Sequence, residues 1–196
     1  MANGAAVHTD TRRKIIDATL LVASRNGFDR ATTSEISRTA GVSEGIIYHY
    51  FRSKQELYLS MVDERASKYR QALKEEIGSI KRPKDKMERL IDFHFRSFTG
   101  KDSIFKGVLD KAGDAPIIKE HIIKLAIIPY SELIAAIIGE GIKAGEFKDV
   151  DIRVAALNLL GMMQVPALVM HFGQAAFSVR SAADTVKRIF FGGILK

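Results

Sequence analysis

Apolar residues recur along most of this chain at the spacing of an amphipathic helix, which buries one face. Within residues 9–27 they fall at i, i+3, i+4, i+7 and i+8, and the members of this stripe are Ile15, Ala18, Thr19, Val22 and Ala23. Gly27 followed by Phe28 is typical of a helix end, because glycine adopts the left-handed conformation and the next side chain packs back on the helix. The pattern predicts a first helix from Thr9 or Asp10 to about residue 26.

Two short helices are predicted next, with a tight turn between them. Thr32-x-x-Glu35 is a capping box, in which each residue bonds the backbone of the other, and it predicts a helix that ends at Gly41. Ser43 is positioned to cap a third helix, which extends to about Tyr50.

The rest of the chain is also helical in pattern. Ser53 begins a longer helix to about Gly78, and Arg82-Pro83 is the clearest break. Further helices are expected over residues 84–99, 103–111, 114–143, 151–172 and 181–192. Asp151 and Ser181 are expected to cap the last two, and Pro129 and Pro166 to kink the helices that contain them. No segment alternates with the period of a strand, so the sequence predicts an all-α fold of about nine helices.

Composition indicates an ordinary soluble chain. Hydrophobic residues make up 46% and charged residues 27%, no cysteine is present, and the net charge is +7. The excess of positive charge is +2 over residues 1–60, +3 over 61–100 and +2 over 101–196, so charge alone locates no binding face. We find no secretory signal and no membrane-spanning run, and we expect a cytoplasmic protein that makes no contact with a membrane.

The sequence gives little support to an enzyme or a metal site. The five histidines are scattered without the paired spacing of metal ligands, and no serine lies in a nucleophile elbow. Gly139, Gly141 and Gly145 follow a predicted helix rather than a strand, so we interpret them as a helix end and not as a dinucleotide loop. We expect no cofactor and no metal.

The two short helices have the form of a helix-turn-helix, in which the second helix enters the major groove of DNA. The alternative is a helical hairpin inside an ordinary core. If Ile46, Ile47 and Phe51 pack inward, the polar residues of the second helix remain at the surface. These are Ser43, Glu44, Gly45, Tyr48 and His49, with Lys54 just beyond, and such groups are suited to phosphate oxygens and base edges.

At this point the sequence resembles the DNA-binding segment of the tetracycline-repressor-like (TetR) family. The resemblance covers about residues 10–60 without a gap. It is carried by Gly27-Phe28, Thr33-x-x-Ile36, Ala40-Gly41-Val42-Ser43, Gly45, Ile47-Tyr48 and Phe51-x-Ser53-Lys54-x-x-Leu57. A weaker similarity to the family's junction between its seventh and eighth helices is found around Gly141 to Asp151.

The resemblance implies a division of roles in DNA binding. Thr33 should bind a backbone phosphate, Ser34, Glu44, Gly45 and His49 should lie nearest the bases, and Tyr48, Tyr50 and Lys54 should anchor the backbone. Ser43 completes the predicted DNA-binding set. Glu44 is the awkward member, because phosphates repel a carboxylate unless it accepts a hydrogen bond from a cytosine amino group. It either reads a base or points away.

The domain organisation expected from the resemblance has four parts. Residues 1–8 form a flexible tail, 9–55 the helix-turn-helix DNA-binding domain, 53–80 a connecting fourth helix, and 84–196 a helical ligand-binding and dimerisation domain.

The predicted helix over residues 151–172 is apolar nearly all round, which requires burial on more than one side. A symmetry partner can cover the second side, together with the final helix, as in the family's four-helix interface. The residues predicted at this dimer interface are Ile152, Ala156, Leu159, Leu160, Val186, Ile189 and Phe190. A core formed entirely within one chain is the alternative.

The resemblance further implies a dimeric repressor that leaves a palindromic operator in double-stranded DNA when a small, mostly apolar ligand binds. The predicted pocket residues are His94, Phe95, Phe98, Phe105, His121, Met162, Met163 and Met170. Apolar stripes at helical spacing often form ordinary core, so these positions are open to that interpretation. Two other functions remain open: a DNA-binding protein controlled by a protein partner or acting in chromosome organisation, and a ligand-binding module with no role on DNA.

Overall fold

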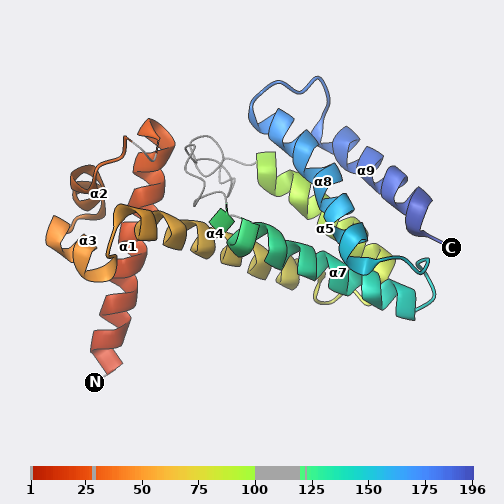
Figure 1. Ribbon diagram of the computed structural model, residues 1–196, viewed down its shortest axis with the longest axis horizontal. Helices are drawn as coiled ribbons and strands as arrows, with labels where there is room; N and C mark the ends of the chain where they lie inside the picture. Colours follow the sequence, from red (N-terminus) through yellow and green to blue (C-terminus); the bar gives the residue numbers. More distant parts are fainter. Residues whose placement is uncertain (1, 28–29, 100–119, 122) are drawn as a thin grey trace. The chain divides into compact units, whose positions relative to one another are not determined.

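A computed structural model describes residues 2–27, 30–99, 120–121 and 123–196, and within them every extended element is a helix (Figure 1). The elements are α1 (Ala2–Asn26), α2 (Thr33–Ala40), α3 (Glu44–Tyr50), α4 (Lys54–Ile77), α5 (Pro83–Thr99), the π-helical turn η1 (Ile123–Ile127), α7 (Ile128–Lys143), α8 (Ile152–His171) and α9 (Val179–Ile194). The predicted all-α fold is confirmed. The helix predicted over residues 103–111 lies outside the described residues.

The described chain divides into two compact units: the residues up to Ser67 group with residues 120–121 and 123–126, and residues 68–99 group with residues 127–196. The N-terminal unit holds α1, α2, α3 and the start of α4, and the C-terminal unit holds the rest of α4 with α5, α7, α8 and α9. The four sequence ranges expected as domains stay a prediction. One local difference concerns residues 2–8, where α1 already begins at Ala2. The alanines at positions 2, 5 and 6 favour helix, and no proline interrupts them.

The N-terminal unit packs three helices and the start of α4 around one apolar core. Its buried members include Ile15, Ile16, Ile36, Ile47, Phe51, Leu57, Tyr58 and Met61. The predicted capping box is confirmed, because the Glu35 amide donates to Thr32 Oγ1 and the Thr32 amide donates to Glu35 Oε2, both at 3.1 Å. Gly41 ends α2 with a φ of 69°, a conformation that glycine adopts without strain.

The starts of α3 and α4 differ in how they are capped. Ser43 occupies the position before α3, but its side chain makes no capping bond, so that part of the prediction is wrong. Ser53 does cap α4, since its Oγ accepts from the Glu56 amide at 3.1 Å. The amide of Arg52, one residue before this cap, donates to Glu56 Oε2 at 2.8 Å.

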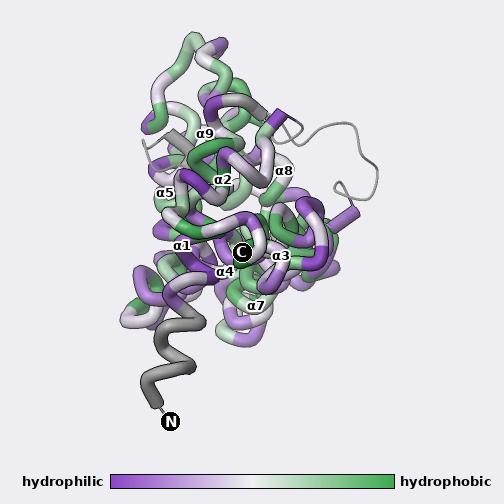
Figure 2. Tube along the Cα trace, turned by 90° about the vertical axis from the view of Figure 1, so that its left-hand side faces the viewer, coloured by the Kyte–Doolittle hydropathy of each residue, from purple (hydrophilic) through white to green (hydrophobic). Residues whose placement is uncertain are grey.

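In the C-terminal unit, α5 packs against α7, α8 and α9, and α8 packs against α7 and α9. Figure 2 shows hydrophobic and hydrophilic residues interspersed along the chain. The core includes Met87, Leu90, Ile91, Phe95, Ile134, Ile138, Phe147, Leu159 and Met163.

The segment between α7 and α8 returns the chain onto α7 and meets the end of α9. Gly145 turns the backbone with a φ of 74° just after α7, as expected for a helix end, whereas Gly139 and Gly141 lie within the last turns of α7. Phe147 then packs against Gly141 and forms an isolated bridge with Leu195. The Lys148 amide donates to the Ile194 carbonyl at 2.8 Å, so this turn is fixed by backbone bonds.

The prolines and the last caps refine the predicted boundaries. Pro129 lies in the first turn of α7, directly after the π-helical turn, because a residue without an amide proton is tolerated there. Helix α8 continues through Pro166.

Asp151 caps α8 as predicted, accepting from the Arg153 and Val154 amides at 3.0 Å. For α9 the predicted cap was wrong by three residues, since Ser178 accepts from the Ser181 amide.

Candidate DNA-binding surface and regulatory region

The outer face of α3 carries the polar residues that the sequence analysis expected there. Ser34, Ser43, Glu44, Gly45, Tyr48 and His49 are exposed, and Thr33, Tyr50 and Lys54 are half-buried. Tyr48 leaves 55% of its surface exposed, whereas Ile47 and Phe51 lie in the core as expected. Ile46 was expected to pack inward, but it is 38% exposed. Successive residues on a helix point about 100° apart, so Ile46 and Ile47 cannot both face the small core.

A hydrogen bond joins the first residues of the two short helices. Thr33 Oγ1 donates to Glu44 Oε2 at 3.0 Å. Sequence reasoning placed both residues on the DNA-binding face, but it did not foresee this contact between positions eleven residues apart.

The aromatic run of α3 is divided between core and surface. Phe51 is buried, with the Arg12 guanidinium 5.3 Å from the centre of its ring. Tyr50 meets His49 edge to face with ring centres 5.3 Å apart, and it lies 6.4 Å from Phe51. The rings therefore connect the exposed face of α3 to the core that supports it.

The C-terminal unit contains a buried polar cluster of Tyr69, His94 and Tyr130, from α4, α5 and α7. The hydroxyl groups of Tyr69 and Tyr130 lie 3.2 and 3.3 Å from His94 Nδ1, and Tyr69 donates to Tyr130 at 3.3 Å. The rings of His94 and Tyr130 are stacked, with centres 5.9 Å apart. His94 was a predicted pocket residue, whereas the tyrosines were missed. Tyr69 and Tyr130 each follow the helical spacing of buried positions, and a buried tyrosine needs a hydrogen-bond partner for its hydroxyl group. That combination is the signal by which the sequence could have pointed to them.

Burial controls the ionisation of this cluster. It lowers the pKa of His94 to about 3, because a charged imidazolium loses its hydration in the core. Burial also raises the pKa of Tyr69 and of Tyr130 well above the usual range for tyrosine. All three groups are therefore neutral at physiological pH, and they offer hydrogen-bonding groups without charge.

The other predicted pocket residues are not gathered at one place. Phe95 and Met163 are fully buried core residues, while Met162 and Met170 are half-buried on α8. His121 is grouped with the N-terminal unit and not with the unit that holds His94. The side chains of Phe98 and Phe105 lie outside the described residues.

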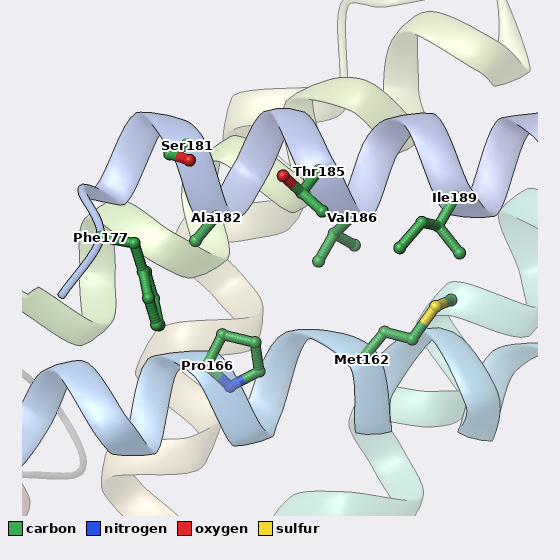
Figure 3. A pocket seen from close by; sticks show the side chains of 8 residues that line it. All are labelled: Met162, Pro166, Phe177, Ser181, Ala182, Thr185, Val186 and Ile189. Atoms are coloured by element: carbon green, nitrogen blue, oxygen red, sulfur yellow. The ribbon is translucent and has the colours of Figure 1, made fainter. Parts of the chain in front are cut away.

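An open apolar groove of about 340 Å³ lies between α8 and α9. Figure 3 shows Met162 and Pro166 on α8 facing Ala182, Val186 and Ile189 on α9. Its remaining lining residues are Phe177, Ser181 and Thr185.

The residues predicted at a dimer interface are mostly inside this chain's own core. Ala156, Leu159, Leu160, Val186 and Phe190 are buried, Ile152 is half-buried, and Ile189 is 61% exposed. The apolar residues that α8, α9 and the segment between them expose are instead Val154, Leu157, Val165, Phe172, Phe177 and Ile189. Sequence reasoning missed most of these, because a helix that is apolar all round does not indicate which side its own domain covers.

Two helical stretches, Ile123–Lys143 and Ile152–His171, are long and apolar enough to cross a membrane by length and composition. Core helices of soluble proteins pass the same test, so this is weak evidence for a membrane span. Among the described residues, no group of three His, Cys, Asp or Glu side chains is arranged to hold a metal ion.

A helix-turn-helix with an exposed polar second helix, followed by a separate helical unit, defines the class of DNA-binding transcriptional regulators. Residues 15–61 match the family described as "Bacterial regulatory proteins, tetR family". Residues 81–167 match "Tetracyclin repressor-like, C-terminal domain". The chain belongs to the TetR family of bacterial transcriptional regulators.

Curated relatives extend over different lengths of the chain. The "Fatty acid metabolism regulator protein" of Bacillus subtilis is 24% identical over 182 residues, which cover 92% of this chain and 94% of that protein. The "HTH-type transcriptional regulator BetI" of Rhizobium meliloti is 34% identical over 86 residues, which cover 44% of this chain and 42% of that protein. These relatives are named as regulators, not as enzymes.

Solved structures have the same fold. The FadR regulator of Bacillus subtilis, solved in complex with stearoyl-CoA, superimposes with a TM-score of 0.81 at 24% identity, covering 92% of this chain and 98% of that one. FadR of Bacillus halodurans gives 0.80 at 22% identity, covering 93% and 95%.

Proposed function

We propose that this protein is a dimeric repressor that leaves a palindromic operator when it binds a long-chain acyl-CoA. The observation that carries the effector class is the similarity along 92% of the chain to a fatty acid metabolism regulator. A relative of the same fold was solved with stearoyl-CoA, whose long acyl chain matches the mostly apolar ligand expected from the sequence.

DNA binding is assigned to the face formed by α2, α3 and the start of α4. The exposed side chains of Ser34, Ser43, Tyr48 and His49 can meet phosphate oxygens or base edges. Lys54 adds a cation at the first position of α4. The Ile47 and Phe51 side chains hold this face on a rigid core, which keeps the polar groups in register with the groove.

Dimerisation is assigned to α8 and α9. The exposed residues Leu157, Val165, Phe177 and Ile189 and the open groove beside them present apolar surface that a second copy would cover. A two-fold dimer repeats each DNA contact, and its recognition helices must lie about 34–36 Å apart to enter successive major grooves. Because the two recognition helices are related by two-fold symmetry, we expect the two half-sites of the operator to form a palindrome.

Effector binding is assigned to the helices of the C-terminal unit. The neutral groups of Tyr69, His94 and Tyr130 can orient a carbonyl or thioester without the cost of burying a charge. The effector weakens operator binding by favouring a dimer shape whose recognition helices no longer match the grooves. A coupling of about 1–3 kcal/mol corresponds to about a 5- to 150-fold loss of affinity.

The test begins with selection of bound fragments from a random duplex library, by the parent and by a Tyr48→Ala, Lys54→Ala double variant. We expect a palindromic site that only the parent enriches. If neither protein enriches any site, the DNA-binding part of the proposal is wrong. If the two proteins enrich the same site equally, the protein binds DNA but the contacts assigned to Tyr48 and Lys54 are wrong.

The selected site then serves to test the effector. Operator affinity is measured with saturating stearoyl-CoA, with a short-chain acyl-CoA and with choline, which a solved structure of the same fold contains. We expect release by the long-chain compound alone. Release by choline would replace the proposed effector class, and no response to any compound would favour control by a protein partner.

A further inference from the structure

The hydrogen bond between Thr33 and Glu44 connects two residues of the proposed DNA-binding face. Thr33 is the first residue of α2 and Glu44 the first residue of α3. The Thr33 hydroxyl donates to Glu44 Oε2 at 3.0 Å, and Glu44 is exposed. The carboxylate is thus held at the start of the recognition helix.

This bond changes what Thr33 can offer to DNA. A hydroxyl has one proton to donate, and here the carboxylate receives it. While the bond exists, the Thr33 side chain cannot also donate to a phosphate oxygen. Its backbone amide lies in the first turn of α2, where amides have no partner within the helix, and it can make the phosphate contact that the sequence analysis gave to Thr33.

The bond also restricts what Glu44 can bind. A carboxylate only accepts hydrogen bonds, and it accepts through both oxygens, so Oε1 can receive a second donor. On a duplex the neighbouring phosphates repel this charge, and only an amino group compensates for the repulsion. In the major groove the amino groups belong to cytosine and adenine, and adenine places the acceptor N7 beside its amino group. Cytosine is therefore the base that suits a carboxylate.

The surface beside Glu44 leaves room for a base edge. Position 45 is glycine, and a Cβ added there would have only Ser43 Oγ within 4 Å, at 3.9 Å. Ser43 and Gly45 are both exposed. Among the described residues, only Ser43 Oγ comes within 4 Å of that position, so the side of α3 at Gly45 is open to an approaching base edge.

We propose that Thr33 holds Glu44 in position to read a cytosine amino group in each half of the operator. Glu44 is then a specificity-determining residue and Thr33 a positioning residue that acts through it. The proposal rests on the proposed function, since it requires an operator. It resolves the two interpretations of Glu44 that the sequence left open in favour of base reading.

The experiment compares base preferences of the parent with those of three variants, Glu44→Gln, Glu44→Ala and Thr33→Val. Each protein selects from the same random duplex library, and affinities are then measured by fluorescence anisotropy on sites that carry each of the four base pairs at the assigned position. For the parent we expect C·G to be preferred by about 5- to 150-fold. In Glu44→Gln we expect adenine instead, because an amide both donates to N7 and accepts from the amino group.

The other variants separate reading from positioning. Glu44→Ala should lose the preference at that position alone and should bind unrelated duplexes more tightly, because a repulsive charge is gone. Thr33→Val keeps the branched shape and the backbone amide, so it should weaken the same preference and leave the others unchanged. Asp149→Asn removes the same charge from an exposed position in the C-terminal unit and should leave every preference as in the parent.

The outcomes distinguish this proposal from the proposed function. If the parent enriches a palindrome and Glu44→Ala keeps its preference at every position, Glu44 reads no base and the inference is wrong, while the repressor stands. If Thr33→Val leaves the cytosine preference unchanged, the positioning role is wrong. If the parent itself enriches nothing, both the repressor and the inference are overturned.

Discussion

At the scale of single residues, Gly141 occupies a place in α7 where the ring of Phe147 lies against the backbone. A Cβ added at Gly141 would overlap that ring, and Phe147 is fully buried and has little room to move. We expect Gly141→Ala to destabilise the protein by about 1–3 kcal/mol, the usual cost of overpacking a core. Urea unfolding followed by circular dichroism measures the change.

Gly139 in the same helix provides a matched control for this prediction. A Cβ there would meet only Ile152 Cδ1, at an ordinary 3.7 Å. Alanine restricts the unfolded chain and favours helix, so Gly139→Ala should stabilise by about 0.5–1 kcal/mol. Equal effects of the two substitutions would show that Phe147 is not the cause.

His94 makes stability depend on pH. Its pKa is lowered to about 3 in the folded protein, against about 6.5 in an unfolded chain. Below pH 6.5 the unfolded state therefore binds a proton that the folded state does not, and stability is lost as the pH falls toward 3. Between pH 7 and pH 5 we expect this residue to account for a loss of about 2 kcal/mol.

The measurement compares urea unfolding at several pH values in the parent, in His94→Gln and in His49→Gln, which changes an exposed histidine. The slope of stability against pH should flatten only in His94→Gln. If the slope of stability against pH is the same in His94→Gln as in the parent, His94 is not the group that titrates.

At the scale of helical elements, the start of α8 depends on one side chain. Asp151 accepts hydrogen bonds from two amides of the first turn, each at 3.0 Å, and its charge also favours the positive end of the helix. We expect Asp151→Ala to lower the free energy of unfolding by about 0.5–2 kcal/mol. Asp149→Ala, two residues earlier and also exposed, should change it by less than about 0.5 kcal/mol. Thermal unfolding of the two variants side by side distinguishes the cap from a general charge effect.

The sequence predicted a feature correctly when the interacting residues lie close together along the chain. The caps at Thr32 and Asp151 were correct because each bond joins residues two or three positions apart. Ser181 was mistaken for a cap because Ser178, three residues earlier, fits the same rule. Helix positions were therefore predicted well, with errors at ends where two residues compete for one role.

Contacts between distant residues were beyond the sequence pattern. Tyr69 meets His94 and Tyr130 across 25 and 61 residues of chain, and no local rule brings them together. The sequence did not indicate which side of α8 is exposed to solvent, because apolar residues surround the helix and leave no polar side. The exposed side chains on the proposed DNA-binding face could be predicted because the core below them is small and regular.

At the scale of the whole molecule, the proposed dimer predicts a specific response to charge. Leu157 on α8 is half exposed, and an arginine there would place an uncompensated charge in the proposed interface. By light scattering at micromolar concentration, we expect the parent at twice its 21.7 kDa mass and Leu157→Arg at the mass of one chain. Asn158→Arg adds the same charge at an exposed polar neighbour and should remain dimeric.

Two results would count against this dimer. A parent protein of 21.7 kDa would exclude the dimer together with its paired half-sites. A dimeric Leu157→Arg variant that still binds the operator would move the interface to another surface.

The first boundary between the two compact units follows Ser67, inside the continuous helix α4. This has a consequence for hybrid sensors in which a foreign DNA-binding half is fused to the C-terminal unit of this protein, the unit proposed to bind the effector. Each residue of a helix advances it by 1.5 Å and turns it by about 100°, so a fusion that adds or omits one residue changes the helical phase of everything beyond it. Ser67 and Lys68 are exposed, and a junction made there residue for residue keeps that phase without altering a buried side chain.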